Sequence, residues 1–155
     1  MGILYNISLL IHSWNRWLII IVGLFLFVTL IASLSRNDNK ISNTQGTALL
    51  FLITLHIQLL IGLLLYFIFS PLTKIAFSDF GSAMANADLR FWAVEHTLLN
   101  IIGIALVQIG YSKSKKKSGK DKHKSLLLWM GIGFLLILLA IPFGIMGVER
   151  PWFRL

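Results

Sequence analysis

Hydrophobic side chains occupy four long stretches of the chain, and each stretch is long enough to cross a lipid bilayer. Runs of about 18 or more apolar residues are typical of membrane helices, because a helix rises about 1.5 Å per residue and the hydrocarbon layer is about 30 Å thick. The sequence predicts such helices over Leu9–Leu34, Ala48–Phe69, Leu89–Tyr111 and Ser125–Met146. We therefore expect an all-α membrane protein, a single domain over residues 1–155 built as an up-down bundle of four transmembrane helices.

The second connecting segment, residues 70–88, is the longest one outside the four predicted spans. Ser70 followed by Pro71 is typical of a helix N-cap and the first residue of the helix. Ile75, Phe77 and Phe80 are apolar. We expect a short helix here, lying on the extracytoplasmic surface or covering the mouth of the bundle, with a plain solvated turn as the alternative.

Charge is distributed unevenly along the chain. The net charge is +8, and seven lysines lie between Lys113 and Lys124. A lysine-rich loop between hydrophobic spans is typical of the cytoplasmic side and of contact with anionic lipids, so we expect a lipid bilayer and no nucleic acid as partner. The lysine-rich third loop is then cytoplasmic, with His123 solvated in it, and both termini are extracytoplasmic. The absence of cysteine excludes disulfides, c-type haem attachment and cysteine-ligated metals.

Three histidines fall inside three different predicted spans. His12 lies about 5 Å below the outer end of the first span, His96 about 10 Å below the start of the third, and His56 about 20 Å from Phe69. A helical bundle can hold a b-type haem between two imidazoles from facing helices. His12 and His96 match best in depth, and their helices are diagonal in an up-down bundle. We expect them to be the axial ligands of a haem iron.

His56 lies on an otherwise apolar face of the second span. The opposite face carries polar and small residues at steps of four and is typical of a helix–helix contact: Thr54, Gln58, Gly62 and Tyr66. Because a neutral imidazole has one donor and one acceptor to satisfy, we expect His56 inside the bundle. It would be a ligand at a second haem site, a quinone-binding residue with Gln58, or hydrogen-bonded to a backbone carbonyl.

Charged side chains gather at the outer end of the spans. Arginine binds carboxylates in a bidentate manner, so Arg16 and Arg90 are candidates to bind the haem propionates. Ordinary pairing with acidic side chains and lipid headgroups is the alternative. Glu95 enters the apolar zone and is expected either to pair with an outer arginine or to carry protons.

Four motifs carry a resemblance to a known family: HSWNRW (12–17), HIQLLIGLLLYF (56–67), RFWAVEH (90–96) and RPWFR (150–154). Through them the chain resembles small bacterial four-helix membrane proteins labelled cytochrome b-like, over nearly its whole length. The resemblance implies haem, electron transfer and the bacterial inner membrane, with matches at His12, His56, His96, Arg16, Arg90 and Glu95. Larger cytochrome b proteins place their ligand pairs in register, whereas only one pair does so here, and this leaves the number of haems open.

Three functions are compatible with these patterns. The first is a b-type cytochrome that passes electrons from membrane quinol to an extracytoplasmic acceptor. The second is a non-enzymatic accessory or assembly subunit of a larger membrane complex. The third is a small transporter or a proton path through Glu95, His96 and His56. A hydrolase is disfavoured, because neither a nucleophile–His–acid arrangement nor an HxxxH metal motif is visible.

Overall fold

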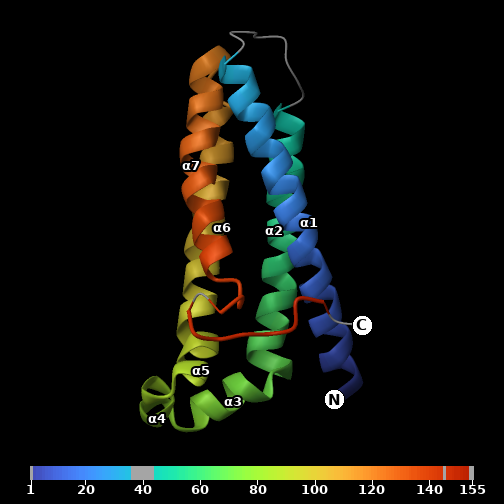
Figure 1. The fold of residues 1–155 in the computed structure, drawn as a ribbon, viewed down its shortest axis with the longest axis vertical. Coiled ribbons are helices and arrows are strands. Elements are labelled where there is room, and N and C mark those ends of the chain that lie inside the picture. The colour runs from blue at the N-terminus through green and yellow to red at the C-terminus, as the bar shows by residue number, and fades with distance from the viewer. Residues whose placement is uncertain (1, 36–43, 145, 154–155) are drawn as a thin grey trace.

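The computed structural model describes residues 2–35, 44–144 and 146–153, and these are mostly helical (Figure 1). The elements are α1 (Gly2–Ser35), α2 (Thr44–Leu64), the π-helix η1 (Leu65–Phe69), α3 (Pro71–Ser78), α4 (Phe80–Ala85), α5 (Ala87–Arg90), the π-helix η2 (Phe91–Glu95), α6 (His96–Ser114) and α7 (Gly119–Leu139). Four continuous helical stretches are long and apolar enough to cross a membrane: Gly2–Ser35, Thr44–Phe69, Ala87–Ser114 and Gly119–Leu139. The prediction of an all-α, multi-pass membrane protein is confirmed.

The helix ends differ from those that the apolar runs predict. α6 continues to Ser114 and α7 begins at Gly119, so the expected lysine-rich loop is mostly helical and only residues 115–118 connect the two. α7 ends at Leu139, short of the predicted Met146. A charged side chain interrupts an apolar run but leaves the helical hydrogen bonds intact, whereas Pro142 lacks the N–H that a helix needs.

The four spanning helices form a ring. α1 packs mainly on α2 and α6 mainly on α7, while contacts of α1 with α7 and of α2 with α6 close the ring, so that α1 and α6 lie diagonally. The α1–α2 pair and the α6–α7 pair draw apart toward the lower end in Figure 1. Many large apolar side chains of the ring are exposed on its outside, for example Phe25, Val28 and Leu135, as contact with lipid requires.

The apolar core fills the upper part of the ring. On α1 its members recur every three or four residues, at Leu26 and Leu30 among others, because that spacing keeps them on one face of a helix. Phe51 of α2 meets Phe134 of α7 edge to face, with ring centroids 5.3 Å apart. This packing leaves the lower part of the ring, where the helix pairs diverge, for a cavity.

The short helices α3, α4 and α5 lie at the lower end of the ring (Figure 1). Each begins with a side-chain cap, from Ser70, Asp79 and Asn86 respectively. Pro71 is the first residue of α3, where its missing N–H costs nothing.

The segment after α7 turns back across the same end. Gly144 and Gly147 have φ of 89° and 78°, in the left-handed region that glycine adopts without strain. Backbone hydrogen bonds join Gly144 N–H to the Val148 carbonyl and Arg150 N–H to the Pro142 carbonyl, at 3.1 Å each. The chain then crosses to α1, as Figure 1 shows in red. This turn carries Arg150 to the opening between the helix pairs.

Candidate functional site

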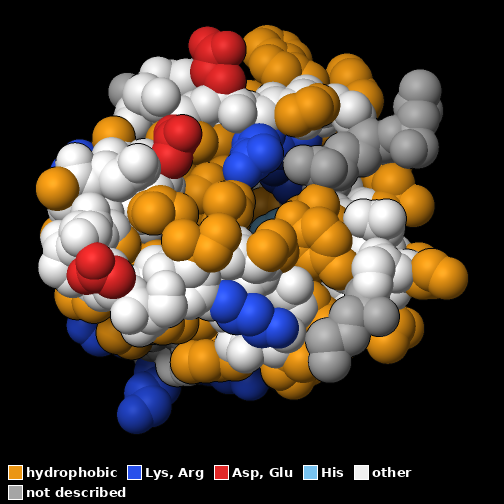
Figure 2. All heavy atoms as spheres, turned by 90° about the horizontal axis from the view of Figure 1, so that it is seen from below, with side chains coloured by type: hydrophobic (Ala, Val, Ile, Leu, Met, Phe, Trp, Pro, Cys, Tyr) orange, Lys and Arg blue, Asp and Glu red, His pale blue; other side chains and the backbone are white. Residues whose placement is uncertain are grey.

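A cavity lies between the two helix pairs at the lower end of the molecule. It has two lobes, one between α2, α3 and α6 and one between α1 and α7. Their volumes are about 860 Å³ and 680 Å³, and both values include the space at the open side of the lobe. Seven residues line both lobes: Leu9, His12, Gln58, Trp92, His96, Asn100 and Arg150. Viewed end-on in Figure 2, this end of the molecule is hollowed near its middle, with hydrophobic and basic side chains around the pit.

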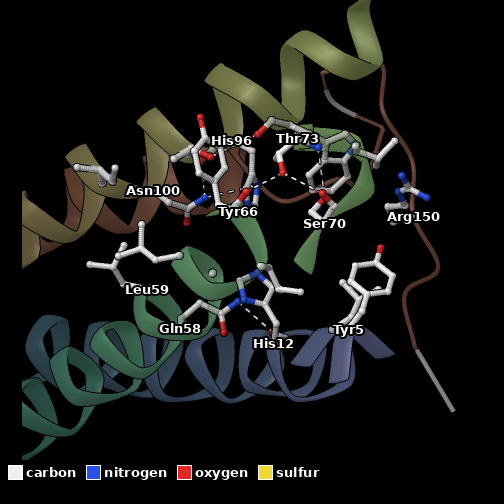
Figure 3. A pocket seen from close by; sticks show the side chains of 18 of the residues that line it. Tyr5, His12, Gln58, Leu59, Tyr66, Ser70, Thr73, His96, Asn100 and Arg150 are labelled. Atoms are coloured by element: carbon white, nitrogen blue, oxygen red, sulfur yellow. Dashed lines mark hydrogen bonds between the residues drawn. The ribbon is translucent and has the colours of Figure 1, made fainter. Parts of the chain in front are cut away.

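His12 of α1 and His96 of α6 face each other across this cavity (Figure 3). Their ring centroids are 6.3 Å apart and their planes are inclined by 58°. The two residues come from helices that lie diagonally in the ring, as expected for the first and third spans of the bundle. Because both line both lobes, the two lobes meet at the histidine pair.

The ring of His96 is oriented by hydrogen bonding. Its Nδ1 lies 2.8 Å from the carbonyl oxygen of Ala140, which directly follows α7. A carbonyl can only accept, so Nδ1 carries the proton and Nε2 keeps its lone pair. This is the arrangement in which a histidine is prepared to bind a metal or accept a hydrogen bond. The rings of Phe91 and Trp92 lie 5.7 and 5.3 Å away and restrict the imidazole further.

The ring of His12 lies against α2 at Gly62. A Cβ added at Gly62 would come within 3.3 Å of His12 Cε1, so the glycine makes room for the imidazole. His12 Nδ1 is buried and has no hydrogen-bond partner among the described residues. A buried polar atom without a partner is costly, so this nitrogen is free, among the described residues, to bind a group in the cavity.

Gln58 fixes the register between α1 and α2. Its Nε2 donates to the His12 carbonyl at 3.1 Å, and its Oε1 accepts from Asn15 Nδ2 at 2.8 Å. Asn15 also donates to the Thr54 carbonyl at 3.0 Å. The polar stripe of α2 therefore faces α1 and the cavity, and Gln58 positions His12 as well as lining the site.

His56 lies on the outer, exposed face of α2 and lines neither lobe. The expectation that it lies inside the bundle is therefore wrong. Successive helical residues are about 100° apart, so Gln58 and His56 cannot both point inward, and the hydrogen bonds of Gln58 decide the orientation. The structure does not bring His56 together with His12 and His96.

The arginines at the cavity are only partly the expected ones. Arg16 lines the lobe between α1 and α7 and donates to the Trp152 carbonyl at 2.6 Å. Arg90 lines neither lobe, because its Nε pairs with Glu95 at 2.8 Å. The interpretation of Glu95 as the partner of an outer arginine is confirmed. Arg150 instead lines both lobes, with its guanidinium 5.3 Å from the centre of the Trp92 ring.

Arg150 begins the RPWFR motif (150–154) but was not among the candidate arginines, which were Arg16 and Arg90. Its position depends on the turn at Gly144 and Gly147, which no periodic pattern reveals. In the sequence, a chain reversal is indicated only by these two glycines, which follow Pro142 at the end of an apolar run. The expected proton path is not assembled, since neither Glu95 nor His56 lines the cavity that holds His96.

His123 is buried at the opposite end of the bundle, contrary to the expectation of a solvated residue. Its Nε2 lies 3.4 Å from Thr44 Oγ1. Because α7 begins at Gly119, His123 falls on the same face as the buried Leu126 and Met130. It is remote from the cavity.

Two of the described residues that line the cavity are histidines, His12 and His96. No group of three or more His, Cys, Asp or Glu side chains that could hold a metal ion occurs among the described residues. A structural zinc site needs four protein ligands and a catalytic one needs three. Two imidazoles suit a metal whose other ligands come with it, as in haem. Comparison with protein-family models, curated protein sequences and solved structures gave no match to this chain.

Proposed function

We propose that this chain is a b-type haem protein of the bacterial inner membrane, in which His12 and His96 would hold one haem. In this proposal the spans run alternately up and down, the termini and α3 are extracytoplasmic, and the lysine-rich end is cytoplasmic. The haem, when bound, supplies a one-electron carrier. The function is then electron transfer between membrane quinol and an extracytoplasmic acceptor.

The separation of the two imidazoles is the observation that carries the proposal. A metal–imidazole bond is about 2.0–2.1 Å, and the ring centre lies roughly 1.2 Å behind the nitrogen, so two imidazoles that share one metal from opposite sides would have centroids about 6.4–6.6 Å apart. The centroids of His12 and His96 are 6.3 Å apart. The two lobes that meet at this pair provide room on either side for a planar group.

The surrounding residues have separate tasks in this proposal. Hydrogen bonding of His96 Nδ1 to the Ala140 carbonyl would make Nε2 a more basic ligand for a bound metal. Apolar side chains such as Leu9 and Ile104 exclude water from the macrocycle. In this proposal Arg16 and Arg150, rather than Arg90, would bind the propionates, because both line the lobe next to α7.

The histidines provide a matched test. The full chain is purified in detergent from haem-replete cells, and the reduced-minus-oxidised visible spectrum is recorded. We expect about one haem per chain, lost in His12→Ala and in His96→Ala. His56→Ala and His123→Ala should retain the spectrum, because neither lines the cavity. Wild-type protein without a Soret band, or haem lost equally in all four variants, would refute the proposal.

The position of His56 favours a second candidate, an accessory subunit of a larger membrane complex. His56 is exposed on α2 about 20 Å along the helix from Phe69, a depth at which an unsatisfied imidazole costs free energy in lipid. A neighbouring helix with a polar side chain would remove that cost. A photo-crosslinker at position 56 should then yield one discrete adduct in membranes, and a crosslinker on another exposed face, at Leu135, should not.

A further inference from the structure

A second cavity opens at the other end of the bundle, where α6 turns into α7. Among the residues that line this groove are Lys116, Lys117, Lys124, Ser125, Leu128 and Trp129. Those on α7 recur at steps of three and four, so they form one stripe that runs down the helix. The groove therefore begins at the charged connection and ends on the membrane-spanning part of α7.

The upper part of the groove attracts anions. Three lysines face a single acidic side chain, Asp121. The positive end of the α7 dipole points into the same place. Ser118, which precedes α7 and also lines the groove, makes no capping hydrogen bond with its side chain. The backbone amides of the first turn thus lack the side-chain acceptor that usually occupies a helix N-terminus.

Ser125 gives an independent indication of a ligand. The residue is 5% exposed, and its Oγ is buried with no hydrogen-bond partner among the described residues. A buried hydroxyl without a partner destabilises a folded protein. Because Ser125 lines the groove beside Lys124, a phosphate oxygen bound there would accept its hydrogen bond.

The lower part of the groove is apolar and faces lipid. Leu128 is 58% exposed on the membrane-spanning helix. The indole of Trp129 lies below the ammonium group of Lys113, with Nζ 3.9 Å from the ring centre, an arrangement typical of the membrane interface. A charged upper end that continues into an apolar strip matches a phospholipid better than a water-soluble phosphate.

We propose that this groove is a binding site for one anionic phospholipid, independent of the haem proposal. The lysines, the first turn of α7 and Ser125 bind the headgroup phosphate. An acyl chain lies along Leu128 and Trp129.

The experiment measures lipid binding to the detergent-purified full chain by native mass spectrometry, with phosphatidylglycerol as the probe and phosphatidylcholine as the zwitterionic comparison. One lysine near an anionic headgroup contributes about fivefold in affinity, so Lys116→Ala/Lys117→Ala should weaken phosphatidylglycerol binding by at least about tenfold. Lys120→Ala/Lys122→Ala is the matched control, because it removes the same charge from the same segment but neither lysine lines the groove. It should lose less than about threefold.

Ser125→Ala tests whether the Ser125 hydroxyl binds the headgroup or is simply an unpaired buried group. It should weaken phosphatidylglycerol binding several-fold while leaving thermal stability in lipid-free detergent unchanged or slightly higher, because it removes an unpaired hydroxyl. Equal losses in the two lysine pairs, or equal binding of the two phospholipids, would overturn the proposal in favour of diffuse attraction. Inorganic phosphate or glycerol 3-phosphate competing as well as the lipid would overturn the assignment of the groove to a phospholipid.

Discussion

Helices α6 and α7 pack against each other through two glycines, and this contact permits a quantitative test. A Cβ added at Gly133 would lie 2.5 Å from the carbonyl oxygen of Gly103 and 2.8 Å from Val107 Cγ2. Ordinary van der Waals contact begins at 3.4 Å, so the helices would have to part by about 0.9 Å. Overpacking costs about 1–3 kcal/mol, and the facing atom is backbone that cannot rotate away. We expect Gly133→Ala to lower the free energy of unfolding by about 2–3 kcal/mol.

Gly131 on the same helix provides the control. A Cβ there would meet only Phe27 Cε1, at 3.5 Å, which is an ordinary contact. Both substitutions gain the same helix propensity, so the difference between them isolates the helix–helix contact. Unfolding by SDS in mixed micelles, followed by circular dichroism, measures both. If the two variants agree within about 0.5 kcal/mol, the close approach of α6 and α7 is refuted.

The same variant tests whether helix packing positions the cavity. The hydrogen bond from His96 to the Ala140 carbonyl joins α6 to the end of α7 at 2.8 Å. A separation of about 0.9 Å would stretch it beyond hydrogen-bonding distance. We therefore expect Gly133→Ala, and not Gly131→Ala, to weaken haem binding as well. Unchanged haem affinity in Gly133→Ala would show that His96 does not depend on this contact.

Two further predictions concern the lower end of the molecule. Tyr66 Oη donates to the Ala93 carbonyl at 2.6 Å, so Tyr66→Phe should lower the free energy of unfolding by about 1–2 kcal/mol in the same SDS assay. The pKa of Asp79 is lowered below its ordinary 3.8 by hydrogen bonds from the hydroxyl and then the backbone N–H of Ser82. A carboxylate with a lowered pKa stabilises the folded state at pH values above its ordinary pKa, and this stabilisation is lost as the pH falls through the folded-state pKa. Hydrogen-exchange protection of α4 should therefore decrease over that pH range. Asp79→Asn should abolish this pH dependence.

The four spans could be predicted because apolar runs of this length are typical of membrane helices. The ends of the helices could not be predicted in the same way. Hydropathy indicates which residues contact lipid, whereas the ends of a helix depend on backbone hydrogen bonds. The lysines at 120, 122 and 124 precede the apolar run, yet each has an N–H and a carbonyl that belong to the first turns of α7. His123 is buried for the same reason, since the helix that carries it begins before the apolar run does.

The arginines could be assigned only in part. Arg16 is fixed by its position on α1, which the sequence predicts. Arg150 reaches the cavity through a turn that requires left-handed backbone at two glycines, and Arg90 is drawn away by Glu95 five residues further on. Long side chains beside several oppositely charged partners cannot be assigned from spacing, because the pairing depends on distances of a few ångströms.

The second span shows how one observation decides between two sequence-based expectations. Both the polar stripe that includes Gln58 and the side chain of His56 were expected to face the interior of the bundle, because polar groups avoid lipid. Residues two apart on a helix differ by about 200°, so only one of the two can face the bundle. Gln58 makes hydrogen bonds with Asn15 and with the His12 carbonyl. Turning His56 inward would break both of these hydrogen bonds, which costs more free energy than leaving one imidazole facing outward. A polar group that faces lipid needs a hydrogen-bond partner from outside the chain. His56→Leu should therefore leave the isolated protein as stable as before, or more stable. The same substitution should weaken any association with another membrane protein that His56 supports.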